Sequence, residues 1–283
     1  MAAAEPGRGA GSSLWPRLAV GVALILLALA ALRLGGWAFT VLAAAAAALM
    51  FDEWGRMHAI PRRWRTAGCG LLAVVALFAH AGEVRMALLL LAIMALALAF
   101  AKAAASPRFA PLGIFYAGLP LVALVRLRDT VGGFELLLWL LGMVWATDIF
   151  AYFSGRAIGG PRIWPAVSPN KTWAGLLGGM AGAALFSLLF AGAVGWGRPA
   201  LLWLAIGLGV AVVAQAGDFF ESFLKRRAGV KDSGAILPGH GGAMDRLDGL
   251  VPVACLAGLW LAFNKGGLWL AFGKAGLYPL ALP

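Results

Sequence analysis

SFLKRRAGVKDSGAILPGHGGAMDRLD, residues 222–248, is a polar stretch between two apolar runs, Leu201–Gly217 and Leu250–Phe263. Both runs are apolar enough to enter a membrane, so the charges between them are expected at or just inside a bilayer surface. Ionisable groups at that depth are costly unless they are paired, hydrated or bound to an ion, which makes them functional candidates. The stretch combines carboxylates, which bind divalent cations, with Lys and Arg, which bind phosphates.

The rest of the chain is unusually apolar. Of its 283 residues, 62% are hydrophobic and 12% are charged, and the mean hydropathy is +0.89. A soluble domain carries about 25% charged residues, so this composition indicates an integral membrane protein. The net charge of +11 does not indicate nucleic-acid binding, because the basic residues are scattered among short loops. Cys69 and Cys255 lie in apolar runs without metal-ligand spacing, which argues against zinc and against a disulfide framework.

Apolar runs predict an all-α, polytopic membrane bundle of about nine transmembrane helices. They are Leu18–Leu32, Trp37–Phe51, Ala67–Ala81, Val84–Ala101, Phe109–Val125, Phe134–Phe150, Trp173–Val194, Leu201–Gly217 and Leu250–Phe263. The first run also has the length of a signal-peptide h-region, but the membrane-protein sequence that follows favours a transmembrane helix. Residues 266–283 are apolar but broken by Lys274 and Pro279, and whether they span the membrane stays open.

The runs divide one continuous membrane domain into parts. Residues 1–17 are predicted to be a disordered cytoplasmic tail, residues 18–133 the N-terminal helices and residues 134–283 the catalytic helices. With the N-terminus inside, most of the 23 Lys and Arg residues fall in inner loops. This positive-inside bias predicts a cytoplasmic N-terminus and a polar site that opens to the cytoplasm.

A polar stripe precedes the signature stretch. Gln215, Asp218, Glu221, Ser222 and Lys225 share one face of a helix that continues from the Leu201 run. Such a stripe faces the bundle interior or a wet cavity. A structural seam between helices explains Gln215 well enough, whereas two carboxylates at this depth favour a functional site.

Asp245 and Asp248 are three residues apart at the expected start of the next helix, so their carboxylates lie side by side. Magnesium is held by one or two carboxylates together with substrate phosphates and waters, which suits this pair. The structural alternative to a metal site is that the two acids only complement the helix dipole in the first turn. With Asp218 and two lysines close in sequence, the pattern favours a metal site formed by Asp218, Asp245 and Asp248.

The segment PGHGG, residues 238–242, lies between these groups. Glycine permits the close backbone approach that lets amides point at phosphate oxygens, so Gly241 and Gly242 are candidate phosphate contacts. A Gly-rich turn alone is weak evidence, because ordinary loops have the same composition. His240 is better suited to donate a hydrogen bond to a phosphate, or to support a neighbouring residue, than to act as a general base. A phosphate that acts as the nucleophile is already ionised and needs no base.

Two further groups precede the stripe. Asp148 closes an apolar run and is followed four residues later by Tyr152; an intramembrane Asp can relay protons or pair helices. Residues 168–173 read SPNKTW, where Ser168 or Asn170 could cap the helix that follows. Lys171 at a helix start is unfavourable for the dipole, so an anion there would be a natural partner.

Together these residues resemble the signature of the phosphatidate cytidylyltransferases, also called CDP-diacylglycerol synthases. The resemblance is carried by SFLKR at 222–226, Lys231-Asp232, LPGHGG at 237–242 and DRLD at 245–248. Asp148, SPNKTW and Gly217-Asp218 extend it over the C-terminal half, whereas the N-terminal runs match only in hydropathy. Ala243 stands where the family usually has a larger aliphatic residue, and Ala174 where members often carry an acid.

The resemblance implies an enzyme that joins CTP and phosphatidic acid to give CDP-diacylglycerol and pyrophosphate. It also implies magnesium with room for a second cation, a homodimer, a multi-pass fold and a place in the bacterial inner membrane. The site residues that it implies are catalytic Lys225, Arg226, Lys231, Asp232, His240 and Arg246; substrate-binding Asp148, Tyr152, Ser168, Asn170, Lys171, Glu221, Ser222, Gly241 and Gly242; and metal-binding Asp218, Asp245 and Asp248.

Two alternatives fit the same residues less well. A CTP-dependent kinase or a cytidylyltransferase acting on another lipid would use similar chemistry on a related fold. A secondary transporter would also carry intramembrane charges, but its broken helices would recur in both halves of the chain. Here the charged groups concentrate in the second half.

Overall fold

The computed structural model describes residues 14–101, 109–234 and 241–263, and every regular element in them is helical. The predicted all-α class is confirmed. The helices, in chain order, are α1 (Leu14–Leu34), α2 (Gly36–Met57), α3 (Arg62–His80), α4 (Val84–Phe100), α5 (Ala110–Asp129), α6 (Gly133–Ile158), α7 (Trp173–Val194), α8 (Ala200–Arg227), α9 (Met244–Leu247) and α10 (Leu250–Phe263).

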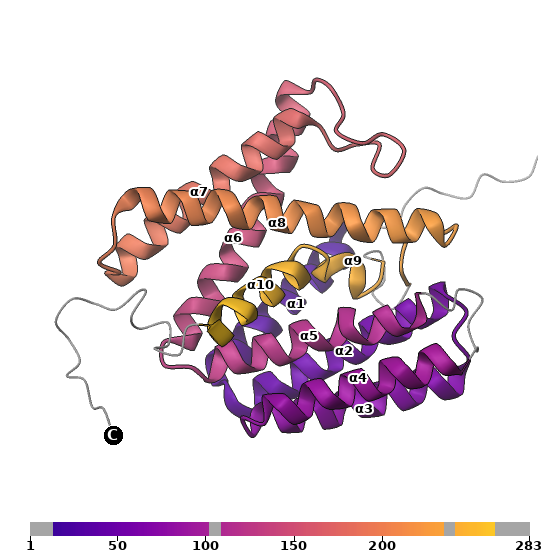
Figure 1. Ribbon diagram of the computed structural model, residues 1–283. Helices are drawn as coiled ribbons and strands as arrows, with labels where there is room; N and C mark the ends of the chain where they lie inside the picture. The colour runs from indigo at the N-terminus through magenta and orange to yellow at the C-terminus, as the bar shows by residue number, and fades with distance from the viewer. Residues whose placement is uncertain (1–13, 102–108, 235–240, 264–283) are drawn as a thin grey trace, which may run out of the picture.

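The helices form two packed groups (Figure 1). In the first, α2–α5 lie side by side around the buried Trp54, Leu72 and Leu91. In the second, α6, α7 and α8 pack around Leu137 and Trp203. α10 lies between the groups and contacts both α5 and α8. The segment joining α8 to α10, which includes α9, is thereby held where the two groups meet.

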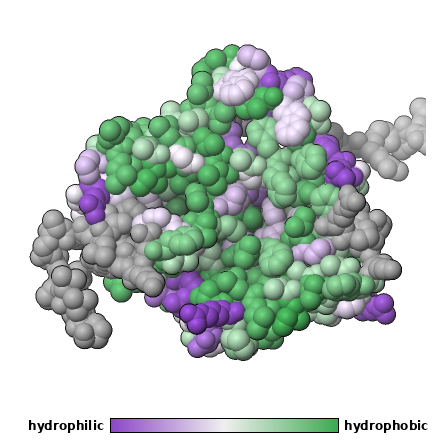
Figure 2. Space-filling model, in the orientation of Figure 1, coloured by the Kyte–Doolittle hydropathy of each residue, from purple (hydrophilic) through white to green (hydrophobic). Residues whose placement is uncertain are grey.

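Apolar side chains cover much of the face shown in Figure 2. Leu26, Leu89, Leu177 and Leu189 are all more than half exposed. Such extensive apolar exposure suits a lipid environment, where helices satisfy their own backbone polar groups. Five described helices (α2, α5, α6, α7 and α8) are long and apolar enough to cross a bilayer, so the protein is a multi-pass membrane protein.

Three helix boundaries differ from the prediction. α1 begins at Leu14, inside the predicted tail, where Pro16 suits a first helical turn. α6 continues through aromatic residues to Ile158 and stops at Gly159, which has a left-handed φ of 68°; Asp148 therefore lies within a helix and does not end one. Asp245 belongs to the separate helix α9, and α10 begins only at Leu250.

Candidate active site

The polar stripe of α8 is the first component of the site. α8 is one continuous helix of 28 residues, so the predicted common face for Asp218, Glu221 and Lys225 is confirmed. Glu221 is fully buried, and its partner is the Lys225 ammonium, with Nζ 3.2 Å from Oε1. Since a buried carboxylate is costly unless a cation is near, this pairing explains how the stripe is tolerated inside an apolar bundle.

Asp245 on α9 is the second partner of Lys225. Its Oδ1 lies 2.5 Å from Lys225 Nζ. Its Oδ2 accepts hydrogen bonds from Ser233 N at 3.0 Å, Ser233 Oγ at 2.8 Å and Gly242 N at 2.8 Å. Burial by itself raises the pKa of Asp245, but the Lys225 ammonium and the Gly242 and Ser233 donors outweigh it and leave that pKa below its usual value. Asp245 is therefore a firmly held carboxylate that orients both Lys225 and the loop before α9.

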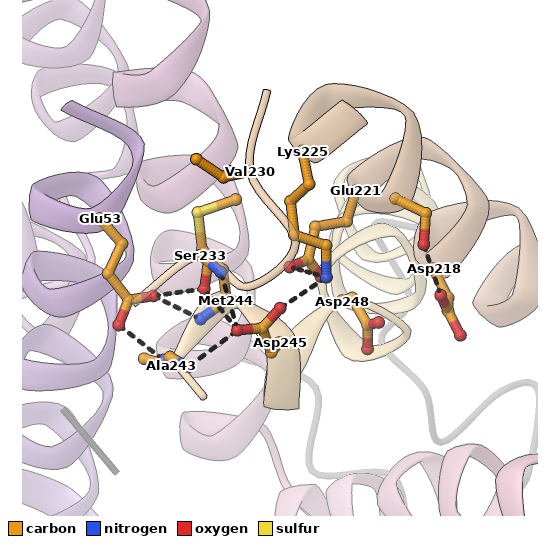
Figure 3. A network of polar contacts seen from close by, with 12 residues as sticks. Glu53, Asp218, Glu221, Lys225, Val230, Ser233, Ala243, Met244, Asp245 and Asp248 are labelled. Atoms are coloured by element: carbon orange, nitrogen blue, oxygen red, sulfur yellow. Dashed lines mark hydrogen bonds and ion pairs between the residues drawn. The ribbon is translucent and has the colours of Figure 1, made fainter. Parts of the chain in front are cut away.

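Glu53 on α2 is a site residue that the sequence did not reveal. Its fully buried carboxylate accepts hydrogen bonds from Ala243 N at 2.8 Å, Met244 N at 2.9 Å and Ser233 Oγ at 3.0 Å. Figure 3 shows a continuous polar network that runs from Glu53 through Ser233 and Asp245 to Lys225 and Glu221. The sequence signal for Glu53 is limited to an acid two residues after the second apolar run, Trp37–Phe51, and nothing near it in the sequence marks it as a site residue.

A second charged cluster surrounds Asp218. Its Oδ2 forms an ion pair with Lys171, and its Oδ1 lies 3.4 Å from the Ser222 hydroxyl. The Lys171 ammonium also lies 4.7 Å from the centre of the Phe219 ring, within range of a cation–π interaction. The anion expected beside Lys171 is thus supplied, in part, by the protein itself.

Asp248 lies close to this cluster because α8 and the start of α10 approach tightly. A Cβ at Gly217 would lie 2.4 Å from the Asp248 carbonyl oxygen, so only glycine permits this approach. The pKa of Asp248 is raised, first by burial and then by the nearby carboxylates of Asp218 and Asp148. Asp248, Asp218 and Asp148 are therefore near enough to repel one another, and this repulsion favours a cation beside them.

The predicted metal set is divided by this geometry. Within the described ranges, no three Asp, Glu, His or Cys residues are arranged to hold a metal ion. Asp245 already has donors on both oxygens, whereas Asp218 and Asp248 are partly buried neighbours that repel each other. One or two carboxylates with phosphates and waters are what magnesium requires, so this pair fits the ion and the assignment of all three acids stays a prediction.

The loop between α6 and α7 places Lys171. It is closed by an antiparallel bridge between Arg162 and Thr172 and by the Ile163 N to Lys171 O hydrogen bond of 3.0 Å. The cap predicted at Ser168 or Asn170 is wrong: Thr172 caps α7, accepting from Gly175 N at 3.1 Å. A hydroxyl directly before the first helical residue has the better reach.

The remaining predicted residues lie around this centre. Arg226 Nε lies 3.4 Å from the Val167 carbonyl oxygen, which connects α8 to the α6–α7 loop. Tyr152 is exposed, and its hydroxyl accepts from Arg156 at 2.9 Å. Lys231, Asp232, Arg246 and Asn170 are exposed, whereas Ser168 and Ser222 are partly buried. His240 lies outside the described residues.

The family's sequence profile, described as "Cytidylyltransferase family", matches residues 15–263. The chain belongs to the cytidylyltransferase family. The resemblance inferred from the 222–248 signature is confirmed at this level. The match also takes in the N-terminal helices, which by their sequence had indicated only membrane hydropathy.

Curated relatives in several bacteria are named phosphatidate cytidylyltransferase. One from Brucella abortus biovar 1 (strain 9-941) is 50% identical over 149 residues, covering 51% of this chain and 53% of the relative. One from Helicobacter pylori (strain J99) is 39% identical over 184 residues, covering 64% and 66%. One from Haemophilus influenzae is 38% identical over 146 residues, covering 47% and 50%. The matched part of this family member thus spans about half to two thirds of the relatives' length.

Proposed function

We propose that this protein is a phosphatidate cytidylyltransferase, which converts CTP and phosphatidic acid to CDP-diacylglycerol and pyrophosphate for phospholipid biosynthesis. The observation that carries the proposal is the fixed position of Lys225. Its ammonium lies between Asp245 and Glu221, on the helix face that also holds the Asp218–Lys171 pair. In this member of the cytidylyltransferase family, acidic and basic side chains thus lie together beside apolar helix surfaces that suit lipid.

The reaction needs positive charge more than proton transfer. An oxygen of the lipid phosphate attacks the α-phosphorus of CTP, a new P–O bond forms, and the bond to the β-phosphate breaks. Pyrophosphate leaves with the electron pair of that bond. Because the attacking phosphate is already ionised, positioning and charge neutralisation dominate catalysis. Lys225, Lys171 and Arg226 are the described cations best placed to bind the phosphates.

Magnesium is the cofactor that we propose. Asp218 and Asp248 would hold it, with Asp148 close by. When bound, the ion would offset phosphate charge and orient the triphosphate. The chain itself contributes the two neighbouring carboxylates, the Gly217 contact that lets α8 approach Asp248, and the Lys171–Asp218 ion pair. A second cation remains part of the same proposal.

We place the site on the cytoplasmic side of the bacterial inner membrane, with a cytoplasmic N-terminus and nine membrane-crossing helices. The excess of Lys and Arg in the loops on one side supports this orientation. A homodimer is proposed from the family resemblance. Cysteine accessibility labelling of the loops tests the orientation, and light scattering of the detergent-solubilised protein tests the oligomeric state.

The deciding experiment measures pyrophosphate release by purified protein in detergent, with CTP and phosphatidic acid, with and without magnesium. Release that requires both substrates and the metal, together with transfer of labelled cytidine to lipid, is expected. Transfer of the γ-phosphate to lipid, without cytidine, would instead identify a CTP-dependent kinase. Absence of any CTP-dependent product would refute the proposal and favour the alternative of a secondary transporter.

A further inference from the structure

Glu53 belongs to the N-terminal helix group, yet its polar partners among the described residues come from the segment between α8 and α10. It lies 190 residues before Ala243, and its carboxylate accepts a hydrogen bond from the Ala243 amide at 2.8 Å. It also accepts from the Met244 amide at 2.9 Å and from the Ser233 hydroxyl at 3.0 Å. The side chain is fully buried, so these donors replace the water that the carboxylate loses on folding.

The partners of Glu53 are unusual for a buried acid. Among the ion pairs of the described residues, none includes Glu53, and its hydrogen-bond donors are two backbone amides and a hydroxyl. A nearby cation could stabilise a carboxylate in several loop conformations. Directional hydrogen bonds from consecutive amides are satisfied in only one of them. Glu53 therefore fixes the backbone where the loop enters α9.

Ser233 connects this fixed point to the charged centre. Its hydroxyl lies 3.0 Å from Glu53 Oε2 and 2.8 Å from Asp245 Oδ2, so one side chain touches both carboxylates. The contact is tight, because a Cβ at Gly242 would lie 2.2 Å from Ser233 Oγ and 2.5 Å from Glu53 Oε2. Asp245 in turn contacts Lys225 Nζ at 2.5 Å. A displacement at Glu53 is therefore passed through Ser233 and Asp245 to Lys225.

We propose that Glu53 is a positioning residue for the nucleotide half of the reaction, acting through Ser233 and Asp245 on Lys225. The proposal rests on the function proposed above, and it assigns to α2 a role in catalysis beyond membrane anchoring. Glu53 touches no reacting atom. Its loss changes where Lys225 and the adjacent loop amides meet the CTP phosphates and leaves the binding of the lipid unchanged.

The test compares Glu53→Gln with Asp52→Asn. Both remove one negative charge from neighbouring positions on α2, but Asp52 is partly exposed, pairs with Arg56 at 2.7 Å and Arg65 at 3.1 Å, and forms no hydrogen bond or ion pair with the described part of the loop. Gln keeps one acceptor oxygen, so either the Ala243 amide or the Met244 and Ser233 donors lose theirs. We expect kcat/KM for CTP to fall by about tenfold or more in Glu53→Gln. The KM for phosphatidic acid and the activity of Asp52→Asn should stay within about twofold of wild type.

Hydrogen–deuterium exchange supplies a readout that does not depend on turnover. Amides 242–245 should exchange faster in Glu53→Gln than in wild type or Asp52→Asn. Unchanged exchange there, an equal loss of activity in both variants, or an equal effect on the two substrates overturns the proposal. Absence of turnover by the wild-type protein would refute the proposed function alone, because the exchange comparison would still decide the role of Glu53.

A second variant covers the case in which Glu53→Gln does not accumulate. Ser233→Ala keeps both carboxylates and removes only the hydroxyl between them. We expect it to lower kcat/KM for CTP by about threefold and to speed exchange at the same amides. Wild-type kinetics together with wild-type exchange in Ser233→Ala would equally overturn the proposed connection.

Discussion

Replacing Lys225 by Met tests the centre of the site, because this one ammonium serves two acids. The change removes the cation 3.2 Å from the fully buried Glu221 and 2.5 Å from Asp245 Oδ1, while the aliphatic volume is nearly kept. Breaking a buried ion pair from one side costs about 3–5 kcal/mol, because the remaining charge has no compensation. Asp245 suffers less, since its Oδ2 keeps three donors.

We therefore expect Lys225→Met to lose cytidylyl transfer and also to lower the Tm in detergent by on the order of 10 °C. The double variant Lys225→Met/Glu221→Gln separates the two effects. Neutralising Glu221 removes the uncompensated charge, so most of the Tm should return while activity stays lost. The assays are fluorescence-detected size exclusion after heating and CTP-dependent pyrophosphate release.

Two results would refute this reasoning. Substantial turnover in Lys225→Met would show that this ammonium does not handle phosphate. A double variant as unstable as Lys225→Met would show that the Glu221 carboxylate is not what the lysine compensates.

Three further predictions concern neighbouring features. Asp248→Asn should abolish turnover without lowering the Tm, because it relieves repulsion while removing a proposed magnesium ligand; activity that survives at low magnesium would reject that ligand. Gly217→Ala should lower both kcat and Tm, because the added Cβ would lie 2.4 Å from the Asp248 carbonyl oxygen. The control Gly209→Ala should leave both unchanged, because a Cβ added there meets nothing within 4 Å beyond its own stretch of helix. Thr172→Val should cost about 1 kcal/mol through the lost cap of α7, seen as a small fall in Tm, with most activity retained; an unchanged Tm would show that the cap contributes no stability.

What the sequence could predict was local or periodic. The α8 stripe followed from helical spacing, because residues three and four apart share a face whatever surrounds them. The membrane class followed from composition, and the family from a contiguous signature. All three depend on residues that are close in sequence, and the structure or the comparisons confirm each of them.

What the sequence could not predict depends on contacts between distant segments. Residues 245 and 248 gave the spacing of one helix, but α9 ends at Leu247 and α10 begins only at Leu250, and Asp245 contacts Lys225 and Ser233. Glu53 had no local signal beyond its charge, because its donors lie 180 to 191 residues away. Lys171 looked like a free anion site, yet Asp218 from another helix already pairs with it.

These distant contacts divide the acids of the site into two sets. Asp245 and Glu53 have their oxygens occupied by donors of the α8–α10 segment, so they hold structure in place. Asp218 and Asp248 instead repel each other where Gly217 lets α8 approach Asp248, although Asp218 also pairs with Lys171. A cation relieves the repulsion between neighbouring carboxylates, whereas fully hydrogen-bonded carboxylates would have to exchange their donors for an ion. Under the proposed function, we therefore expect the cation to bind at Asp218 and Asp248 while Asp245 keeps Lys225 in place.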